Sequence, residues 1–201
     1  MKKYIYLVVL SILLPNYFPA NESLLNYTHV LFEWSQIQDS DLYEIQISNN
    51  SDFTNIVSSA TTPSLVYIEK NSIDWDTEYF WRIRGVNTDS NTNFTWSPIH
   101  SFSTTNQRSN ASSTTYFEND YSNGITIFSS FLDYFSAAID QNGNEIWNTS
   151  NTNLVYYTEN NMQFYGTQFG SNDSELPGVM FSLDNEILWS ETGDAYVHHD
   201  F

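Results

Sequence analysis

The sequence is 201 residues long, which is room for one large or two modest domains, and 40% of it is hydrophobic and 17% aromatic. The formal net charge of −18 at pH 7 excludes nucleic acid as a partner, because binding to phosphate requires clustered lysine and arginine. The sequence has no cysteine, which excludes disulfides, thiolate metal sites and a lipid-anchored cysteine.

The first twenty residues have the layout of a secretory signal peptide. Lys2 and Lys3 form a positive n-region, Tyr4 to Leu14 is an apolar h-region, and the segment ends at the small residue Ala20. The apolar run is shorter than the ~20 residues that a membrane-spanning helix needs, so we expect no membrane insertion of the mature chain. The pattern predicts removal of residues 1–20, give or take a few, and a mature protein that is secreted, periplasmic or on the cell surface. An apolar first strand is the alternative.

The stretch from residue 21 to residue 104 alternates between apolar and polar side chains, and no segment of the chain shows a sustained helical period. The side chains predicted to face inward are Val30, Phe32 and Trp34, then Tyr43, Ile45 and Ile47, then Tyr79, Trp81 and Ile83. Strands with one buried face alternate in this way, and clusters of turn residues separate them. The pattern predicts an all-β chain that begins with a two-sheet sandwich of about seven strands.

The order of landmarks in this stretch resembles the fibronectin type III domain of bacterial secreted proteins. The landmarks are Trp34, Tyr43-x-Ile45-x-Ile47, Phe53, Ile73 before Tyr79, Trp81-Arg82-Ile83-Arg84, Trp96-Ser97 and Phe102-x-Thr104. The resemblance implies that Tyr79 is a tyrosine-corner residue bonded to nearby backbone, and that Trp34 and Trp81 are core residues. Such a module is usually a spacer. Sugar binding through exposed aromatics such as Trp75, Phe80 or Trp96 is the alternative.

Residues 105–115 are predicted to be a linker, because they are polar apart from one alanine and include no aromatic side chain. The composition then changes, since residues 116–201 hold thirteen aspartates and glutamates and no lysine or arginine. Within this region the stretch from Ala138 to Trp147 is echoed by the stretch from Ser182 to Trp189. Each copy is an apolar strand that ends in Asp, a turn, and a strand that ends in Trp. The copies lie 44 residues apart at Asp and 42 at Trp.

The turn of the first copy contains Asn142-Gly143, a strong hairpin signal that predicts a type I′ turn with positive φ at both central residues. The spacing of the copies is typical of a four-stranded propeller blade, and an ordinary meander of hairpins is the alternative. Blades bury their faces against one another. We therefore expect residues 116–201 to be an incomplete propeller from a longer protein, with Trp147 and Trp189 as structural residues.

The second region resembles the opening blades of the arylsulfotransferase-like family. The resemblance is carried by Gly124-Ile125-Thr126-Ile127-Phe128-Ser129-Ser130, Ala138-Ile139-Asp140, Gly143-Asn144-x-x-Trp147, Pro177-Gly178, Asp184, Trp189 and His198-His199-Asp200-Phe201. It implies a secreted propeller that transfers a sulfuryl group from a phenolic sulfate ester to a phenol acceptor. The family uses a histidine nucleophile and no nucleotide sulfate, so no cofactor is implied.

Residues 116–201 depart from that family because they offer no lysine or arginine to hold a sulfate. The family's nucleophile lies in later blades, so the catalytic residues are expected beyond Phe201 and this polypeptide is expected to be inactive. His198 and His199 are candidates for substrate contact. Neighbours on a strand point to opposite faces, so at most one of them faces a central channel. A structural role for both is the alternative.

Asp140, Asn142 and Asn144 also match the first half of a calcium loop. Glu145 stands where that loop needs glycine and Asn151 where it needs its closing glutamate, so no metal site is predicted and a hairpin turn accounts for the same residues. The leading hypothesis is the N-terminal portion of an exported arylsulfotransferase-like protein. The alternative is a secreted, non-enzymatic adhesion or glycan-binding protein built of β-modules.

Overall fold

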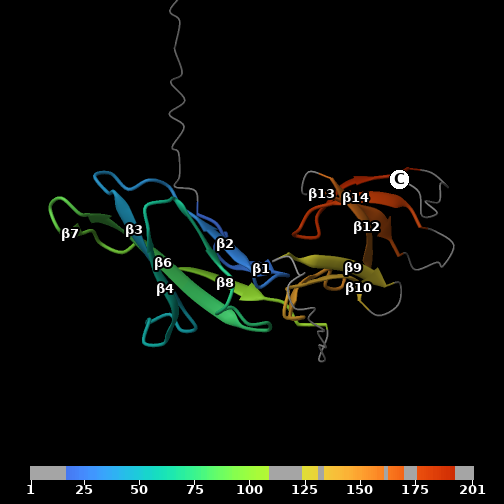
Figure 1. The fold of residues 1–201 in the computed structure, drawn as a ribbon, viewed down its shortest axis with the longest axis horizontal. Helices are drawn as coiled ribbons and strands as arrows, with labels where there is room; N and C mark the ends of the chain where they lie inside the picture. The colour runs from blue at the N-terminus through green and yellow to red at the C-terminus, as the bar shows by residue number, and fades with distance from the viewer. Residues whose placement is uncertain (1–16, 109–123, 131–133, 161–162, 170–175, 193–201) are drawn as a thin grey trace, which may run out of the picture.

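The computed structural model describes residues 17–108, 124–130, 134–160, 163–169 and 176–192. Every helix or strand element in these residues is a β-strand, so the all-β prediction is confirmed. Figure 1 shows a sandwich formed by the N-terminal half beside a second part formed by the C-terminal half. No described residue lies in a helix long and apolar enough to span a membrane.

The sandwich consists of eight strands in two sheets. In chain order they are β1 (Ser23–Leu25), β2 (Val30–Glu33), β3 (Leu42–Ser48), β4 (Ile56–Thr62), β5 (Val66–Glu69), β6 (Glu78–Asn87), β7 (Thr92–Asn93) and β8 (His100–Thr104). The larger sheet has the order β1-β8-β6-β3-β4 with β7 attached to β6, and the smaller sheet pairs β2 with β5. β1 runs parallel to β8, and the other pairs are antiparallel. This arrangement is a fibronectin type III-like sandwich.

The predicted alternation is confirmed on β2, β3 and β6. The side chains that these strands place in the core are Val30 and Phe32, then Tyr43, Ile45 and Ile47, then Tyr79, Trp81 and Ile83, and Trp34 joins them just after β2. In the register of β3 with β6, Ile45 lies opposite Ile83 and Ile47 opposite Trp81, so apolar side chains neighbour each other on the inner face. A fully buried side chain of this size contributes roughly 1.5–3 kcal/mol, which makes this set the main source of stability.

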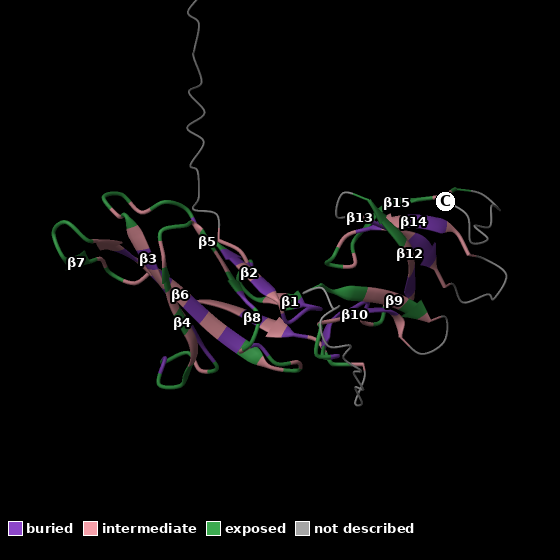
Figure 2. Ribbon diagram, viewed as in Figure 1, coloured by how far each residue is buried: buried purple, intermediate pink, exposed green. Residues whose placement is uncertain are grey.

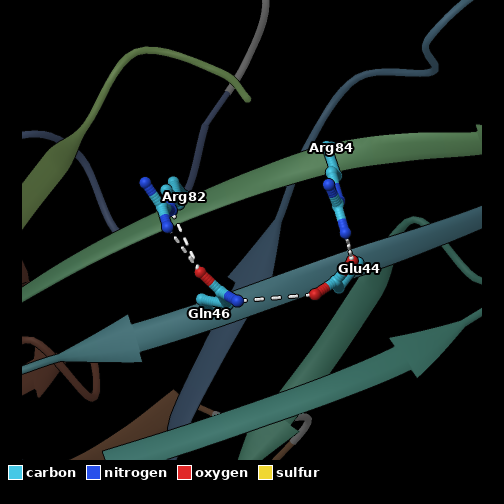
Figure 3. A network of polar contacts seen from close by, with 4 residues as sticks. All are labelled: Glu44, Gln46, Arg82 and Arg84. Carbon is cyan, nitrogen blue, oxygen red and sulfur yellow. Dashed lines mark hydrogen bonds and ion pairs between the residues drawn. The ribbon is translucent and has the colours of Figure 1, made fainter. Parts of the chain in front are cut away.

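The outer face of β3 and β6 carries a ladder of polar side chains (Figure 3). Arg82 donates to Gln46 Oε1 at 2.8 and 3.1 Å, and Arg84 Nε donates to Glu44 Oε2 at 2.7 Å. The two guanidinium carbons lie 4.4 and 4.5 Å from the centroid of the Trp96 ring. The indole therefore makes cation–π contacts with both arginines, which hold the outer face of this sheet together.

The sandwich includes residues that precede position 21. The backbone of Phe18 exchanges two hydrogen bonds with Glu33, at 2.9 and 2.8 Å. The Tyr17 ring lies 4.3 Å from the His100 ring and 6.0 Å from the Trp81 ring, measured between centroids. Residues 1–16 of the predicted signal peptide lie outside the described residues. Cleavage after Ala20 would remove the contacts of Tyr17 and Phe18, whereas cleavage before Tyr17 would keep them.

The described residues of the second part form seven strands in two antiparallel sheets. The strands are β9 (Thr126–Ser130), β10 (Phe135–Ile139), β11 (Glu145–Asn148), β12 (Leu154–Asn160), β13 (Gln163–Gln168), β14 (Gly178–Phe181) and β15 (Ile187–Ser190). We name the sheet of order β11-β10-β9 the first repeat sheet, and the sheet of order β12-β13-β14-β15 the second repeat sheet. Ser136 on β10 connects them, because its hydroxyl donates to the Leu154 carbonyl at 2.9 Å and accepts from the Tyr156 amide at 2.7 Å.

The last hairpins of the two repeat sheets, β10 with β11 and β14 with β15, have the same register at a constant step of 42 residues. The pairs of β10 with β11 are Ala137 with Asn148, Ala138 with Trp147 and Ile139 with Glu145, and those of β14 with β15 are Val179 with Ser190, Met180 with Trp189 and Phe181 with Ile187. Both hairpins have their bulge at the equivalent place. Ser182 occupies the place of Asp140 in the second turn, so Asp184, which lies 44 residues from Asp140, is not its structural counterpart.

The predicted type I′ turn at Asn142-Gly143 is also wrong in its type. Gly143 has a φ of 79°, but Asn142 is not among the residues with positive φ. The Gly143 amide donates to the Asp140 carbonyl and the Asp140 amide to the Asn144 carbonyl, both at 3.0 Å, which is a type I turn followed by a left-handed residue. The second repeat sheet has the same pattern, with Asn185 in the place of the glycine at a φ of 62°.

The sandwich and the first repeat sheet are joined by backbone pairing. The segment Asn26–Thr28, which lies between β1 and β2, runs along β11, with the Thr28 amide donating to the Ile146 carbonyl at 2.9 Å and the Asn148 amide donating to the Asn26 carbonyl at 3.1 Å. One hydrophobic core cluster includes side chains from the sandwich and from both repeat sheets. The described part of the predicted linker joins this contact, because the Asn148 side-chain amide donates to the Asn106 carbonyl at 3.2 Å.

Candidate functional site

A polar cleft lies at the junction between the sandwich and the first repeat sheet. It encloses a cavity of about 310 Å³. On the sandwich side its lining includes His29, Lys70 and Trp75, and on the other side Asp140 and Glu145. We name it the junction cleft. A neighbouring cavity of about 380 Å³ shares His29, Lys70 and Asp140 with it, so the cleft continues along the same wall.

The sandwich wall of the cleft is held by Glu69, the last residue of β5. Its side chain is buried, and one carboxylate oxygen accepts the amides of Lys70, Asn71 and Ser72 at 2.9, 2.8 and 3.1 Å. The other oxygen accepts the hydroxyls of Ser58 and Tyr67. Burial alone would raise the pKa of Glu69, but these hydrogen bonds outweigh it and lower the pKa. The charged carboxylate therefore fixes the turn that carries Lys70 and Asn71 into the cleft.

The opposite wall is the turn between β10 and β11. One carboxylate oxygen of Asp140 accepts the amides of Asn142 and Asn144 at 2.8 and 2.9 Å, and the other accepts the Asn144 side-chain amide at 2.9 Å. Burial raises the pKa of Asp140, but the hydrogen bonds from Asn144 and Asn142 lower it by more than burial raises it, so the pKa lies below its ordinary value. The three residues that resembled a calcium loop therefore bond to one another and cap a hairpin turn.

Trp75 is fixed across the junction. Its indole N–H donates to the Glu145 carbonyl at 2.9 Å, while the half-buried ring lines the cleft. The buried Glu145 carboxylate accepts the Arg108 amide at 3.0 Å and the Asn148 side-chain amide at 2.7 Å. The bonds from Trp75 and Arg108 join the sandwich side to β11, and the bond from Asn148 holds the Glu145 side chain within β11, so the aromatic wall cannot move without breaking the junction.

His29 is the histidine that lines the cleft. Burial, and then the charge of Lys70, lower the pKa of His29 below its ordinary 6.5, so the imidazole is neutral at neutral pH. The charge of Asp140 opposes this lowering of the His29 pKa, while the Asp140 oxygens accept three hydrogen bonds from their own turn. Among the described residues, no group of three or more His, Cys, Asp or Glu side chains is placed to hold a metal ion.

The structure disperses the residues that the sequence singled out. Trp34, Tyr79 and Trp81 are buried in the sandwich, and the Tyr79 hydroxyl accepts the Asp74 amide at 2.8 Å, as a tyrosine corner requires. Trp147 is buried between the repeat sheets, whereas Trp189 is 52% exposed. His198 and His199 lie outside the described residues.

Of the three aromatics proposed for sugar contact, only Trp75 lines the junction cleft. Trp96 is engaged by Arg82 and Arg84, and Phe80 lies half-buried on the outer face of β6. Sequence reasoning missed Lys70 and Asn71, whose only signal was their place in a turn cluster directly after an apolar strand.

Among known proteins, solved structures with fibronectin domains are similar to the chain at low identity. No protein-family model and no curated protein matches the chain. A fibronectin type III-like protein from Clostridium thermocellum is similar to the chain at 12% identity and a TM-score of 0.35, covering 46% of this chain and 96% of that protein. The third fibronectin III domain of human KIAA0343 is similar at 13% identity and a TM-score of 0.33, covering 47% of this chain and 90% of that domain. The FN1–FN3 domains of chicken CNTN1 are similar at 9% identity and a TM-score of 0.36, covering 82% of this chain and 51% of that one.

These TM-scores and identities are low, so the fold assignment rests on the strand order and register. The strand order and the pairing register of the sandwich are both those of a fibronectin type III-like domain. A protein built of β-modules is the description that the fold carries, and function has to be argued from the cleft.

Proposed function

We propose that the protein is an exported, non-enzymatic β-module protein that binds a neutral oligosaccharide in the junction cleft. The observation that supports this most directly is the fixed ring of Trp75, which shares one cavity with Asn71, Asn142 and Asp140. Binding sites typically combine an apolar or aromatic wall with a few placed polar groups. The junction cleft has both, and its walls are held from the two sides of the junction.

The chemistry of a sugar matches this wall. A pyranose ring has an apolar C–H face, which packs on an aromatic ring, and a rim of hydroxyl groups, which bond to amides and carboxylates. The charge of the cleft also favours a neutral ligand, since Asp74, Asp140 and Glu145 outnumber Lys70 and the neutral His29. An anionic ligand would be repelled by the three carboxylates.

The proposal is tested by titrating the mature chain with a panel of neutral oligosaccharides in a calorimeter. We expect one class to bind, Trp75→Ala to weaken binding by at least about tenfold, and Trp75→Phe, which keeps an aromatic face, to retain most of it. Trp96→Leu is the matched control, because that indole is occupied by arginines and lies elsewhere. Failure of every oligosaccharide to bind, or unchanged binding by Trp75→Ala, would refute the proposal.

A second candidate function is sulfuryl transfer between phenols by a longer protein of the arylsulfotransferase-like family. The 42-residue step of the repeat sheets supports it, because that period is typical of four-stranded propeller blades. The test is transfer from a phenyl sulfate donor to phenol by the full-length protein. Absence of turnover in a folded full-length protein would count against this candidate and leave the sugar proposal untouched.

A further inference from the structure

The strands β11 and β15 are equivalent in register but opposite in burial. Trp147 on β11 is 2% exposed, and its counterpart Trp189 on β15 is 52% exposed. Ile146 is 5% exposed, and its counterpart Leu188 is 43% exposed. In Figure 2, β15 is drawn as exposed along its length while the neighbouring β14 is largely buried. The local structure is therefore the same, and the neighbours differ.

Trp147 has two neighbours, which are Tyr27 of the sandwich segment, paired with it along β11, and the second repeat sheet, packed on its ring. The Phe164 ring on β13 lies 5.1 Å from the Trp147 ring between centroids, and the Trp147 indole N–H donates to the Leu183 carbonyl at 2.7 Å. Phe164 is itself buried, and Leu183 lies in the turn between β14 and β15. Contact between successive sheets thus uses an aromatic ring from a second strand and a carbonyl from a turn.

Trp189 has neither partner. No acceptor for its indole N–H exists among the described residues, and its side chain is flanked by the exposed Ile187 and Leu188. We propose that the face of β15 is the docking surface for a further sheet of the same 42-residue repeat, which presents an aromatic ring and a turn carbonyl to Trp189. The docked sheet would contact Trp189 as the Phe164 ring and the Leu183 carbonyl contact Trp147. It would thereby continue an interface that the chain already contains.

A second copy of this chain does not offer the required contacts. In its first repeat sheet, the register places Thr126 where Phe164 stands, so this sheet offers a turn carbonyl at Gln141 but no aromatic ring at that place. In its second repeat sheet, Phe164 is already packed against its own Trp147. The occupant is therefore a further sheet that resembles the second repeat sheet.

The test supplies such a sheet. Residues 150–192 are repeated directly after Glu191, whose backbone bond to Gly178 at 2.8 Å is the counterpart of the bond from Thr149 to Ser136 at 3.1 Å, so that the added copy begins in register. The chain is labelled with 5-fluorotryptophan. In the added copy, the tryptophan that corresponds to Trp189 is replaced by phenylalanine, so that it gives no signal. The resonance of Trp189 itself is assigned by its loss in the variant Trp189→Phe. The readout is the solvent isotope shift of that resonance.

We expect a large isotope shift for Trp189 in the 201-residue chain and a small one, like that of Trp147, after the copy is added. The matched control replaces the Phe164 counterpart in the added copy with serine, and its Trp189 resonance should stay exposed. An exposed Trp189 beside a folded added sheet would overturn the proposal. So would an added copy that contributes no strand signal in circular dichroism, or a native chain in which Trp189 becomes shielded as it dimerises.

Discussion

The sandwich and the second part close their cores in different ways. In the sandwich, the inner faces of two sheets cover each other, and the ladder of Arg82, Trp96 and Arg84 covers an outer face. In the second part, the first repeat sheet is covered by the second repeat sheet and by the sandwich segment Asn26–Thr28, while β15 carries exposed apolar side chains. The sandwich is thus complete within its own strands, and the second part depends on its neighbours.

The difference teaches that a repeated sheet takes its burial from what lies beside it. β11 and β15 share strand length, register and the position of a tryptophan, yet only β11 is buried. Stability in such a stack is approximately a sum of interface contributions between neighbours. Removing one contact at a time from each part therefore tests the comparison.

The largest expected effect is the contrast between Trp147→Ala and Trp189→Ala. Loss of the Trp147 ring leaves a cavity between the sheets and removes one of the two donors to the Leu183 carbonyl, so the free energy of unfolding should fall by about 3–5 kcal/mol. Loss of the exposed Trp189 ring should change it by less than about 0.5 kcal/mol. Urea denaturation of both variants measures the difference. Equal losses would mean that the two indoles are equally buried in solution.

The next effect concerns the sandwich wall of the cleft. Glu69→Gln removes the charge that accepts three backbone amides and two hydroxyls in a buried position, and we expect a loss of roughly 1.5–3 kcal/mol. Because the folded pKa of Glu69 is lowered, its contribution is present above the ordinary value of 4.5 and is lost as the pH falls toward the folded pKa. Urea denaturation at pH 7 and pH 4 should therefore show a larger deficit at pH 7. A deficit independent of pH would contradict this role.

Much of the sandwich was predictable because its signal is local. The period-two alternation through Tyr43, Ile45 and Ile47 decides which face of β3 is buried, whatever the strand pairs with. The turn at Asn142-Gly143 was predictable as a hairpin but not in its type, because the same dipeptide suits both turns. The carboxylate of Asp140, which caps the following amides, accompanies the observed type.

The junction cleft was not predictable, because its walls come from segments about 70 residues apart that carry no periodic signal. No local pattern marks Asn26–Thr28 as a strand that pairs with β11. In the sequence Trp75 is one of three aromatic candidates for sugar contact, and only the bond from its indole to the distant Glu145 carbonyl places it in the cleft. For the same reason, Trp147 and Trp189 were given one structural role. Their shared pattern describes the strand, and their burial depends on the neighbouring sheet.

A smaller effect is expected from cutting one connection between the two parts. The side-chain amide of the buried Asn26 donates to the carbonyls of Asn148 and Leu183, at 2.8 and 2.9 Å. Asn26→Ala leaves both carbonyls without this donor, and we expect a loss of about 1–2 kcal/mol. Differential scanning calorimetry should also show the melting of the second part separating from that of the sandwich. Asn71→Ala, an exposed asparagine, is the control and should leave a single transition.

The smallest expected effect is a dependence on pH at the start of the sandwich. Burial lowers the pKa of His100 below its ordinary 6.5, and its ring lies 4.3 Å from the Tyr17 ring and 5.1 Å from the Trp81 ring between centroids. The unfolded chain therefore binds the proton more readily than the folded one, so stability is full above pH 6.5 and falls as the pH drops toward the folded pKa. His29, whose pKa is also lowered, adds to this dependence of stability on pH, and the carboxylates contribute mainly below the ordinary pKa of 4.5 of Glu69.

The variant His100→Phe keeps an aromatic ring at this place and removes the group that binds the proton. Its urea midpoints, measured from pH 7 to pH 5, should therefore change less with pH than those of the native chain. An unchanged slope would show that the histidine is solvated and that Tyr17 does not cover it, which would place the start of the sandwich after Tyr17.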